Sequence, residues 1–481
     1  MEKTDVLIVG AGISGVGAAC HVKQNCPQKS FVVVEAREAI GGTWDLFRYP
    51  GIRSDSDMYT MGYRFKPWIG DKALADGDSI RNYICAAASE NAVSEHIRTG
   101  HRVTAAQWDS ERASWQVDIL QVATGDTIQI ESRYLYLCTG YYDYEHPYKP
   151  AFSGSEAFSG IIVHPQHWPE DLDYAGKNVV VVGSGATAVT MVPAMADKAA
   201  HVTMLQRTPT YILSVKAVDA MSTFLRGYLP DRVSYHLTRW KNILTGMLVY
   251  QICTRRPEWA KAYVRKGLVA LLGEDYDIDR HFKPDYDPWD QRLCMVPDGD
   301  LFHAINDGKA AVVTDRIDHF TATGLALQSG ARLDADIVVT ATGLTIKLFD
   351  GIGLTVDGEP VVIPDKTIYR GMMLSGVPNM AFTVGYTNAS WTLKADLVAG
   401  FFTRVINFMD AHGYRQCCPH DHSGEEHTEP MMTLQSGYVL RAASDFPHEG
   451  KKAPWKMYQN YILDKLTFKF ASLTDGTMEF G

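Results

Sequence analysis

The stretch Asp5-Val-Leu-Ile-Val-Gly-Ala-Gly-Ile-Ser-Gly15 decides the fold, because it joins a short apolar run directly to a glycine-rich turn. Residues 6–9 predict a buried parallel strand, and the turn after them opens a helix. In this pattern Gly10 permits the tight turn and Gly12 lets the backbone approach a pyrophosphate. Gly15 lets the helix pack closely on the strand.

A nucleotide would use the start of this helix and the end of the next strand. The pyrophosphate would lie at the helix N-terminus, beside Ser14, where free N–H groups and the helix dipole favour anions. The apolar run 31–34 ends in Glu35, where a carboxylate would accept hydrogen bonds from a ribose 2′-OH. The pattern predicts dinucleotide binding; the alternative is a packing turn without a ligand.

A second turn of the same kind follows the apolar run 178–182. It reads Gly183-Ser-Gly-Ala-Thr-Ala188, with an alanine that the pattern allows at its third glycine position. We expect a second dinucleotide at this turn, held by Gly183, Gly185, Ala186 and Thr187.

The second site is predicted to prefer NADPH over NADH. The strand expected over 201–206 runs into Arg207 and Thr208 and has no acid at its end. A guanidinium can bind a 2′-phosphate with two hydrogen bonds, and the threonine hydroxyl can add another. The alternative is that Arg207 is a solvated surface charge.

The first dinucleotide is predicted to be FAD. Residues 41–44, which contain Thr43 and Trp44, and residues 48–55 resemble the flavin-proximal loops of flavoprotein monooxygenases. Dithiol flavoenzymes carry a redox cysteine pair in the corresponding region. Because this chain has no cysteine between positions 26 and 85, thiol relay chemistry is excluded.

The segment between the two turns carries a family resemblance. Residues 158–169 have the form F-x-G-x-x-x-H-x-x-x-W-P and resemble the fingerprint of type I Baeyer–Villiger monooxygenases. Residues 44–57, 287–294 and 385–396 resemble the ethionamide-activating group within that family. The five fixed fingerprint positions are Phe158, Gly160, His164, Trp168 and Pro169. His164 and Trp168 lie in a linker, so we predict that they couple domains and do not transfer protons.

The resemblance implies a reaction and a pair of charged residues. In the family, NADPH reduces FAD, O₂ adds to the flavin C4a carbon, and the resulting peroxide converts a ketone into an ester or lactone. Arg292 matches the arginine that stabilises the developing negative charge, and Asp55 matches the carboxylate that orients it. A structural ion pair is the alternative. Gln291 stands where many members have a lysine that helps to bind the 2′-phosphate, so the NADPH preference is expected to be weaker than usual.

These observations predict an α/β protein with two dinucleotide-binding (Rossmann-like) domains and a helical insertion. Residues 1–145 and 344–481 form the FAD-binding domain, and residues 146–212 and 290–343 form the NADPH-binding domain. Residues 213–289 form the insertion, in which apolar residues recur at three- and four-residue steps and which shapes the substrate site in the resemblance.

The insertion has an unusual charge. Residues 216–266 hold ten lysines and arginines against three acids, in a chain of net charge −10. One interpretation is a solvated helix face. The other is contact with the surface of a membrane that supplies apolar ketones.

Composition limits the remaining possibilities. Across the 481 residues the acidic balance argues against a nucleic-acid partner, and the eight scattered cysteines indicate free thiols. Without a signal peptide or an apolar run long enough to span a membrane, a cytoplasmic enzyme is expected, with peripheral membrane contact as the alternative that the insertion leaves open. The histidines and cysteines of 417–422, with His427, are interpreted as a surface loop without a metal. Oligomeric state and physiological substrate are left open.

The sequence leaves three functions open. The leading one is an oxygenase that takes O₂ and a small ketone or sulfide as substrates and uses FAD and NADPH. The second is a heteroatom monooxygenase that oxidises thioethers or thioamides without significant ketone oxidation. The third is a non-enzymatic flavoprotein, which the presence of Asp55 and Arg292 argues against.

Overall fold

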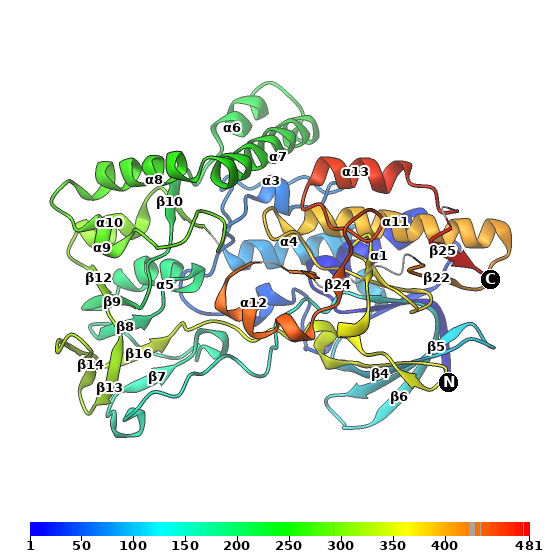
Figure 1. Cartoon of the computed structure of the whole chain (residues 1–481), viewed down its shortest axis with the longest axis horizontal. Coiled ribbons are helices and arrows are strands. Elements are labelled where there is room, and N and C mark those ends of the chain that lie inside the picture. Colours follow the sequence, from blue (N-terminus) through cyan, green and yellow to red (C-terminus); the bar gives the residue numbers. More distant parts are fainter. Residues whose placement is uncertain (292, 423–428, 433, 475) are drawn as a thin grey trace.

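The computed structural model describes residues 1–291, 293–422, 429–432, 434–474 and 476–481. It is an α/β structure with two dinucleotide-binding units, the fold class predicted from the sequence. The unit that contains both chain termini lies on the right of Figure 1, and the second unit lies on the left.

The first unit is built on a nine-stranded sheet. Strands β6, β1, β2 and β3 run parallel, as expected for a nucleotide fold, and β4, β5 and β6 form an antiparallel meander beside them. Helices α1 (Ile13–Asn25), α4 (Gly77–Glu90) and α11 (Trp391–His412) share one apolar cluster with the sheet. The strand order is β18 (Glu359–Pro360), β17 (Gly353–Val356), β4 (His101–Asp109), β5 (Ser114–Gln121), β6 (Thr127–Leu137), β1 (Glu2–Val9), β2 (Phe31–Val34) and β3 (Ile97–Arg98), with β21 (Met380–Phe382) paired to β6.

The second unit is built on a five-stranded parallel sheet. Most buried residues of its central strands are valine, isoleucine, leucine or methionine, because both faces of the sheet are covered. Helices α5 (Ala186–Ala196) and α10 (Asp300–Asn306) pack on one face. The strand order is β12 (Ala310–Thr314), β9 (His201–Gln206), β8 (Asn178–Val182), β16 (Ile337–Thr340) and β7 (Ile161–Val163).

The region predicted as a helical insertion contains four helices. These are α6 (Ala220–Arg226), α7 (Asp231–Arg255), α8 (Pro257–Leu272) and α9 (Ile278–His281). A short strand, β10 (Ile212–Val215), leads into them and pairs in parallel with β11 (Cys294–Pro297). Helices α6, α7 and α8 lie along the upper edge of the molecule with α13 (Tyr461–Phe470) (Figure 1). Within the described residues, no helix is long and apolar enough to cross a membrane.

The smaller elements complete the structure. The interpretation of residues 417–422 as a surface loop is wrong for Cys417 and Cys418. Both are buried in β22 (Cys417–Pro419), because that strand pairs with β25 (Met478–Phe480). The smaller strands are β13 (Ile317–Thr321), β14 (Gly324–Leu327), β15 (Arg332–Asp334), β19 (Ile368–Tyr369), β20 (Met373–Leu374), β22 (Cys417–Pro419), β23 (Glu429–Pro430), β24 (His448–Glu449) and β25 (Met478–Phe480); the smaller helices are α2 (Thr43–Leu46), α3 (Met58–Met61) and α12 (Gly437–Arg441).

Two chain segments connect the two sheets, and they run side by side. The first follows β6 and the second follows β16. Tyr142 and Ile346 form an antiparallel bridge, and the Asp143 amide donates to the Thr345 carbonyl at 2.9 Å. The Thr342 hydroxyl donates to the Tyr148 carbonyl at 3.1 Å. Paired linkers hold the relative position of two domains better than a single linker can, because each restrains the other.

Candidate active site

A cavity of about 420 Å³ lies where the first glycine-rich turn meets the end of β2. Its walls include the predicted cofactor residues Gly10, Gly12, Ser14, Glu35, Thr43 and Trp44. Helix α1 begins at this cavity without a side-chain cap, so its first N–H groups are available to an anion. Both features fit the pyrophosphate end of FAD.

Two glycines of the turn, Gly10 and Gly15, have no room for a side chain. Gly10 has a φ of +101°, and a Cβ at this position would lie 2.5 Å from the Cys138 carbonyl oxygen. A Cβ at Gly15 would lie 1.7 Å from the carbonyl oxygen of Gly10. Gly15 does not line the cavity; it allows α1 to start directly against the turn.

Glu35 is buried at the end of β2 and is already held by backbone donors. The Ala11 amide donates to one carboxylate oxygen at 2.6 Å, and the Arg37 amide donates to the other at 3.0 Å. Burial raises the pKa of Glu35, while these two hydrogen bonds act in the opposite direction. A carboxylate has about four acceptor positions, so two backbone donors leave capacity for a ribose hydroxyl.

A larger cavity of about 770 Å³ adjoins the first. Both cavities are lined by Thr43, Trp44, Met61, Tyr142 and Trp391. The larger one also includes residues 386–391, which resemble the flavin-facing loop, and Ala186 and Thr187 at the start of α5. The structure therefore brings both glycine-rich turns to one connected space.

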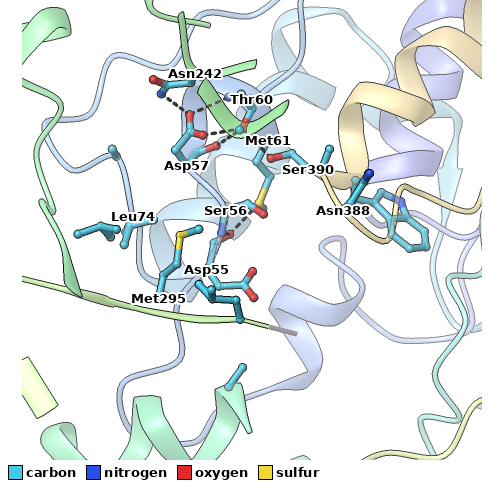
Figure 2. Close-up of a pocket in the computed structure, with 18 of the residues that line it drawn as sticks. Asp55, Ser56, Asp57, Thr60, Met61, Leu74, Asn242, Met295, Asn388 and Ser390 are labelled. Carbon is cyan, nitrogen blue, oxygen red and sulfur yellow. Dashed lines mark hydrogen bonds between the residues drawn. The ribbon is translucent and has the colours of Figure 1, made fainter. Parts of the chain in front are cut away.

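Asp55 lies in the wall of the larger cavity, where Figure 2 draws it among the lining residues near Met295. Its predicted partner, Arg292, lies outside the described residues. Leu293 and Cys294, which follow it directly in the chain, line the same cavity as Asp55. Gln291 is half-buried and forms a parallel bridge with Pro288 just before this point.

A polar network connects the insertion to the segment that carries Asp55. The sequence does not predict this network. Asn242 on α7 donates to a carboxylate oxygen of Asp57 at 2.9 Å, and the Thr60 amide and hydroxyl also donate to Asp57 (Figure 2). Thr60 and Ser390 share a hydrogen bond of 2.6 Å. No sequence signal could have indicated Asn242, because its partner lies 185 positions away.

The second glycine-rich turn repeats the geometry of the first. Gly183 has a φ of +141°, and a Cβ there would lie 2.4 Å from the Ala341 carbonyl oxygen. Gly185 is the residue before helix α5 and provides no side-chain cap. The Ser184 hydroxyl donates to the Thr208 carbonyl at 2.8 Å and so ties this turn to the end of β9.

Arg207 is exposed directly after β9, as the sequence predicts. In the part of the chain that the structure describes, it has no hydrogen bond and no ion pair. Its guanidinium is therefore available to a ligand phosphate. Thr208 is half-buried beside it.

The fingerprint residues lie away from both cavities, at the edge of the second sheet. Phe158 packs edge-on against Phe320, and a Cβ at Gly160 would lie 2.4 Å from the Asp336 carbonyl oxygen. Trp168 contacts Tyr174 edge-on, and Pro169 follows it. These contacts attach the segment to the second unit, through β13 and the chain between β7 and β8.

The same segment also reaches the linker after β6. The Gln166 side chain donates to the Asp143 carbonyl at 2.8 Å, and His167 lies 3.0 Å from the Tyr144 carbonyl. His164 is buried, and its Nδ1 accepts from the Gln166 amide at 3.2 Å. Burial lowers the pKa of His164 to about 4, so its imidazole is neutral near pH 7. This position agrees with the predicted role in domain coupling, which stays a prediction.

All eight cysteines are free, and burial raises the pKa of Cys20 to about 12 and that of Cys26 to about 11. Among the described residues, no group of three or more histidines, cysteines and acids is placed to hold a metal ion. His427 lies outside those residues.

Comparison with known proteins identifies relatives along the whole chain. The FAD-containing monooxygenase EthA of Mycobacterium tuberculosis H37Rv is 51% identical, with 100% of this chain and 98% of that protein covered. The probable FAD-binding monooxygenase AlmA of Acinetobacter baylyi is 48% identical, with 100% and 97% covered. A family model described as pyridine nucleotide-disulphide oxidoreductase matches residues 7–233.

Solved structures share the fold at low sequence identity. A steroid monooxygenase bound to NADP has a TM-score of 0.78 at 22% identity, with 99% of both chains covered. A cyclohexanone monooxygenase with bound ε-caprolactone has a TM-score of 0.78 at 18% identity and full coverage of both chains. The enzyme OTEMO in complex with FAD and NADP has a TM-score of 0.78 at 20% identity, with 99% of both chains covered.

The fold and the two connected cavities define a flavoenzyme with two dinucleotide sites. The chain belongs to the family of FAD-containing monooxygenases that includes EthA and AlmA. The predicted family resemblance is confirmed, and with it FAD as a cofactor. The predicted NADPH stays a prediction, which the shared fold of NADP-bound relatives supports.

Proposed function

We propose that this monooxygenase converts ketones into esters or lactones and that it also oxidises sulfur in thioethers or thioamides. In the main reaction, a ketone, O₂, NADPH and a proton give an ester, water and NADP⁺. One oxygen atom enters the C–C bond beside the carbonyl, and the other leaves as water.

One observation carries the proposal. The larger cavity adjoins the FAD cavity and is bordered by the N-terminus of α5, by Asp55 and by the chain next to Arg292. A hydride donor, the flavin and a carbonyl substrate can therefore meet in one space. FAD, once reduced by NADPH, supplies the activation of O₂.

The chain's own task is to place and stabilise charge. Nucleophilic attack on a ketone puts negative charge on the carbonyl oxygen, and a fixed cation beside it lowers the barrier. Arg292 suits this task because a guanidinium keeps its charge and cannot release a proton to the substrate. Asp55 would act as the positioning residue that orients it.

The rest of the cavity suits an apolar substrate. Leu74, Ile243, Met247 and Met295 contribute apolar side chains to its wall. Methionine adapts its shape to irregular ligands, so this wall favours a range of apolar ketones.

The test compares Arg292→Ala with wild type and with the exposed control Arg280→Ala. We expect Arg292→Ala to bind FAD and to be reduced by NADPH at a normal rate, and to lose ketone oxygenation by about 100-fold or more. Asp55→Asn should reduce oxygenation in the same step by a smaller factor. Products are identified by mass spectrometry with a panel of ketones and thioethers.

The outcomes separate the alternatives. Wild-type ester formation by Arg292→Ala would contradict the assigned role. A wild-type enzyme that oxidises thioethers and no ketone in the panel would establish the heteroatom monooxygenase instead.

A further inference from the structure

We propose that the outer face of helices α6, α7 and α13 binds the surface of an anionic lipid bilayer. We call this surface the lipid face; it lies along the upper edge of the molecule in Figure 1. Its large apolar side chains are all exposed: Phe224, Tyr228, Val233, Leu237, Trp240, Leu244, Leu248, Leu463, Leu466 and Phe470.

Helix α7 exposes its apolar stripe and buries its polar side, the reverse of a helix that packs on a protein core. Its outward stripe runs from Val233 to Leu248 through Leu237, Trp240 and Leu244, at steps of three and four residues. Its inward side is largely polar, with Ser234, Tyr235, Thr238 and Arg239 buried. A helix exposed only to water would be expected to bury its apolar stripe, so the reversal indicates a non-aqueous neighbour.

The buried polar side fixes this orientation. One guanidinium nitrogen of Arg239 donates to the carbonyls of Tyr59 and Gly62, each at 2.7 Å, and the other lies 3.5 Å from the Asp396 carboxylate. Tyr235 donates to the Tyr63 carbonyl at 3.0 Å. Rotating α7 to bury its leucines would break these bonds and leave Arg239 exposed and Asp396 without this ion pair.

Helix α13 extends the face. Leu463, Leu466 and Phe470 form an exposed stripe on it, again at steps of three and four residues. The two stripes adjoin, because Lys465 lies 4.3 Å above the Trp240 ring and Tyr461 contacts the same ring. Amphipathic helices that lie flat in a membrane interface have such Leu, Trp and Phe faces.

Cationic side chains surround the lipid face and favour a negatively charged surface as its partner. Arg232, Arg255 and Arg256 on α7 or at its end, and Lys465 and Lys469 on α13, have no ion-pair partner among the described residues. The acid of α13, Asp464, is buried and accepts from Lys394 at 2.9 Å. In a chain of net charge −10 this local excess of positive charge matches an anionic surface. Two copies of the face would instead bring like charges together.

The experiment measures sedimentation of the FAD-loaded enzyme with vesicles. We expect binding to mixed phosphatidylcholine–phosphatidylglycerol vesicles, much weaker binding to phosphatidylcholine alone, and release at high salt. Leu248→Glu should lower binding at least about tenfold by removing apolar contact and adding a repelled charge. Arg232→Ala and Lys469→Ala should each lower it about fivefold.

Leu440→Glu is the matched control, because Leu440 on α12 is 60% exposed and Leu248 is 61% exposed. It should bind vesicles like wild type, and all variants should oxidise NADPH at the wild-type rate, which shows that they fold. No binding to anionic vesicles at low salt would overturn the proposal. Equal losses of vesicle binding for Leu248→Glu and Leu440→Glu would also overturn it. A third contrary result would be a wild-type dimer that Leu248→Glu converts into monomers, with neither protein binding vesicles.

Discussion

Arg207 and Glu35 occupy equivalent places in the two nucleotide units, and their charges are opposite. Each residue directly follows the second strand of its unit, β9 or β2. A carboxylate at this position accepts from a ribose hydroxyl and repels a 2′-phosphate, whereas a guanidinium attracts the phosphate. We therefore predict that this pair of residues lets one chain separate FAD from NADPH with two similar turns.

Replacing Arg207 with alanine should weaken NADPH use and leave NADH use unchanged. A charge-assisted bidentate contact is worth about 1.5–3 kcal/mol, so kcat/KM for NADPH should fall about 10- to 100-fold. Steady-state NADPH and NADH oxidation measure the effect. Arg332→Ala, an exposed arginine on β15, is the control. An unchanged ratio of the two coenzymes would show that Arg207 is a solvated surface charge.

Residues at strand ends can be predicted from the sequence. Residues in networks that join distant segments of the chain cannot. Glu35 and Arg207 were predicted correctly in position because an apolar run fixes where a parallel strand ends. Asn242 and Asp57 meet only after the insertion folds over the first unit, so no local pattern contains their contact. Roles assigned to Asp55 and Arg292 rest on resemblance, because charge alone does not specify a partner.

At the scale of elements, the two units repeat a strand, a tight turn and an uncapped helix. Helices α1 and α5 both follow a glycine, Gly12 or Gly185, that provides no side-chain cap. Unsatisfied N–H groups at a helix start are costly unless water or an anion meets them. Gly185 faces open space, since a Cβ built there meets nothing within 4 Å. That space is where the structure leaves room for a pyrophosphate.

Gly185→Ala should therefore impair NADPH binding without impairing folding. The added methyl group fits the protein alone and would collide with a phosphate held at the start of α5. We expect the KM for NADPH to rise about tenfold or more and the thermal midpoint to stay unchanged. Gly267→Ala, also in open space but on α8, should leave the KM unchanged. Normal NADPH affinity in Gly185→Ala would place the pyrophosphate elsewhere.

Periodicity predicted the helices of the insertion but not which side of them is buried. The apolar steps in residues 225–252 correctly indicate helix, and most of those residues lie on α7. Leu237, Leu244 and Leu248 nevertheless point outward, while Arg239 is buried. An apolar stripe predicts a helix in any apolar surrounding, so the pattern does not distinguish a protein core from a lipid surface.

At the scale of the whole molecule, α7 separates the large cavity from the lipid face. Asn242, Ile243 and Met247 line the cavity, while Leu244 and Leu248 belong to the lipid face. A helix with its side chains is about 10 Å across. An apolar substrate dissolved in a bound bilayer would thus lie about one helix diameter from the wall of the large cavity.

This arrangement predicts that membrane binding aids only lipid-soluble substrates, a prediction that rests on the proposed function. Leu248→Glu should lower the rate on a long-chain ketone carried in anionic vesicles about fivefold or more, because the enzyme must then take the ketone from water. The rate on a short, water-soluble ketone should match wild type, since Leu248 does not line the cavity. Product is quantified by gas chromatography, with Leu440→Glu as the control. If both ketones lose rate equally, Leu248 affects catalysis itself; if neither does, the bilayer is not the route of entry, although ketone oxidation still stands.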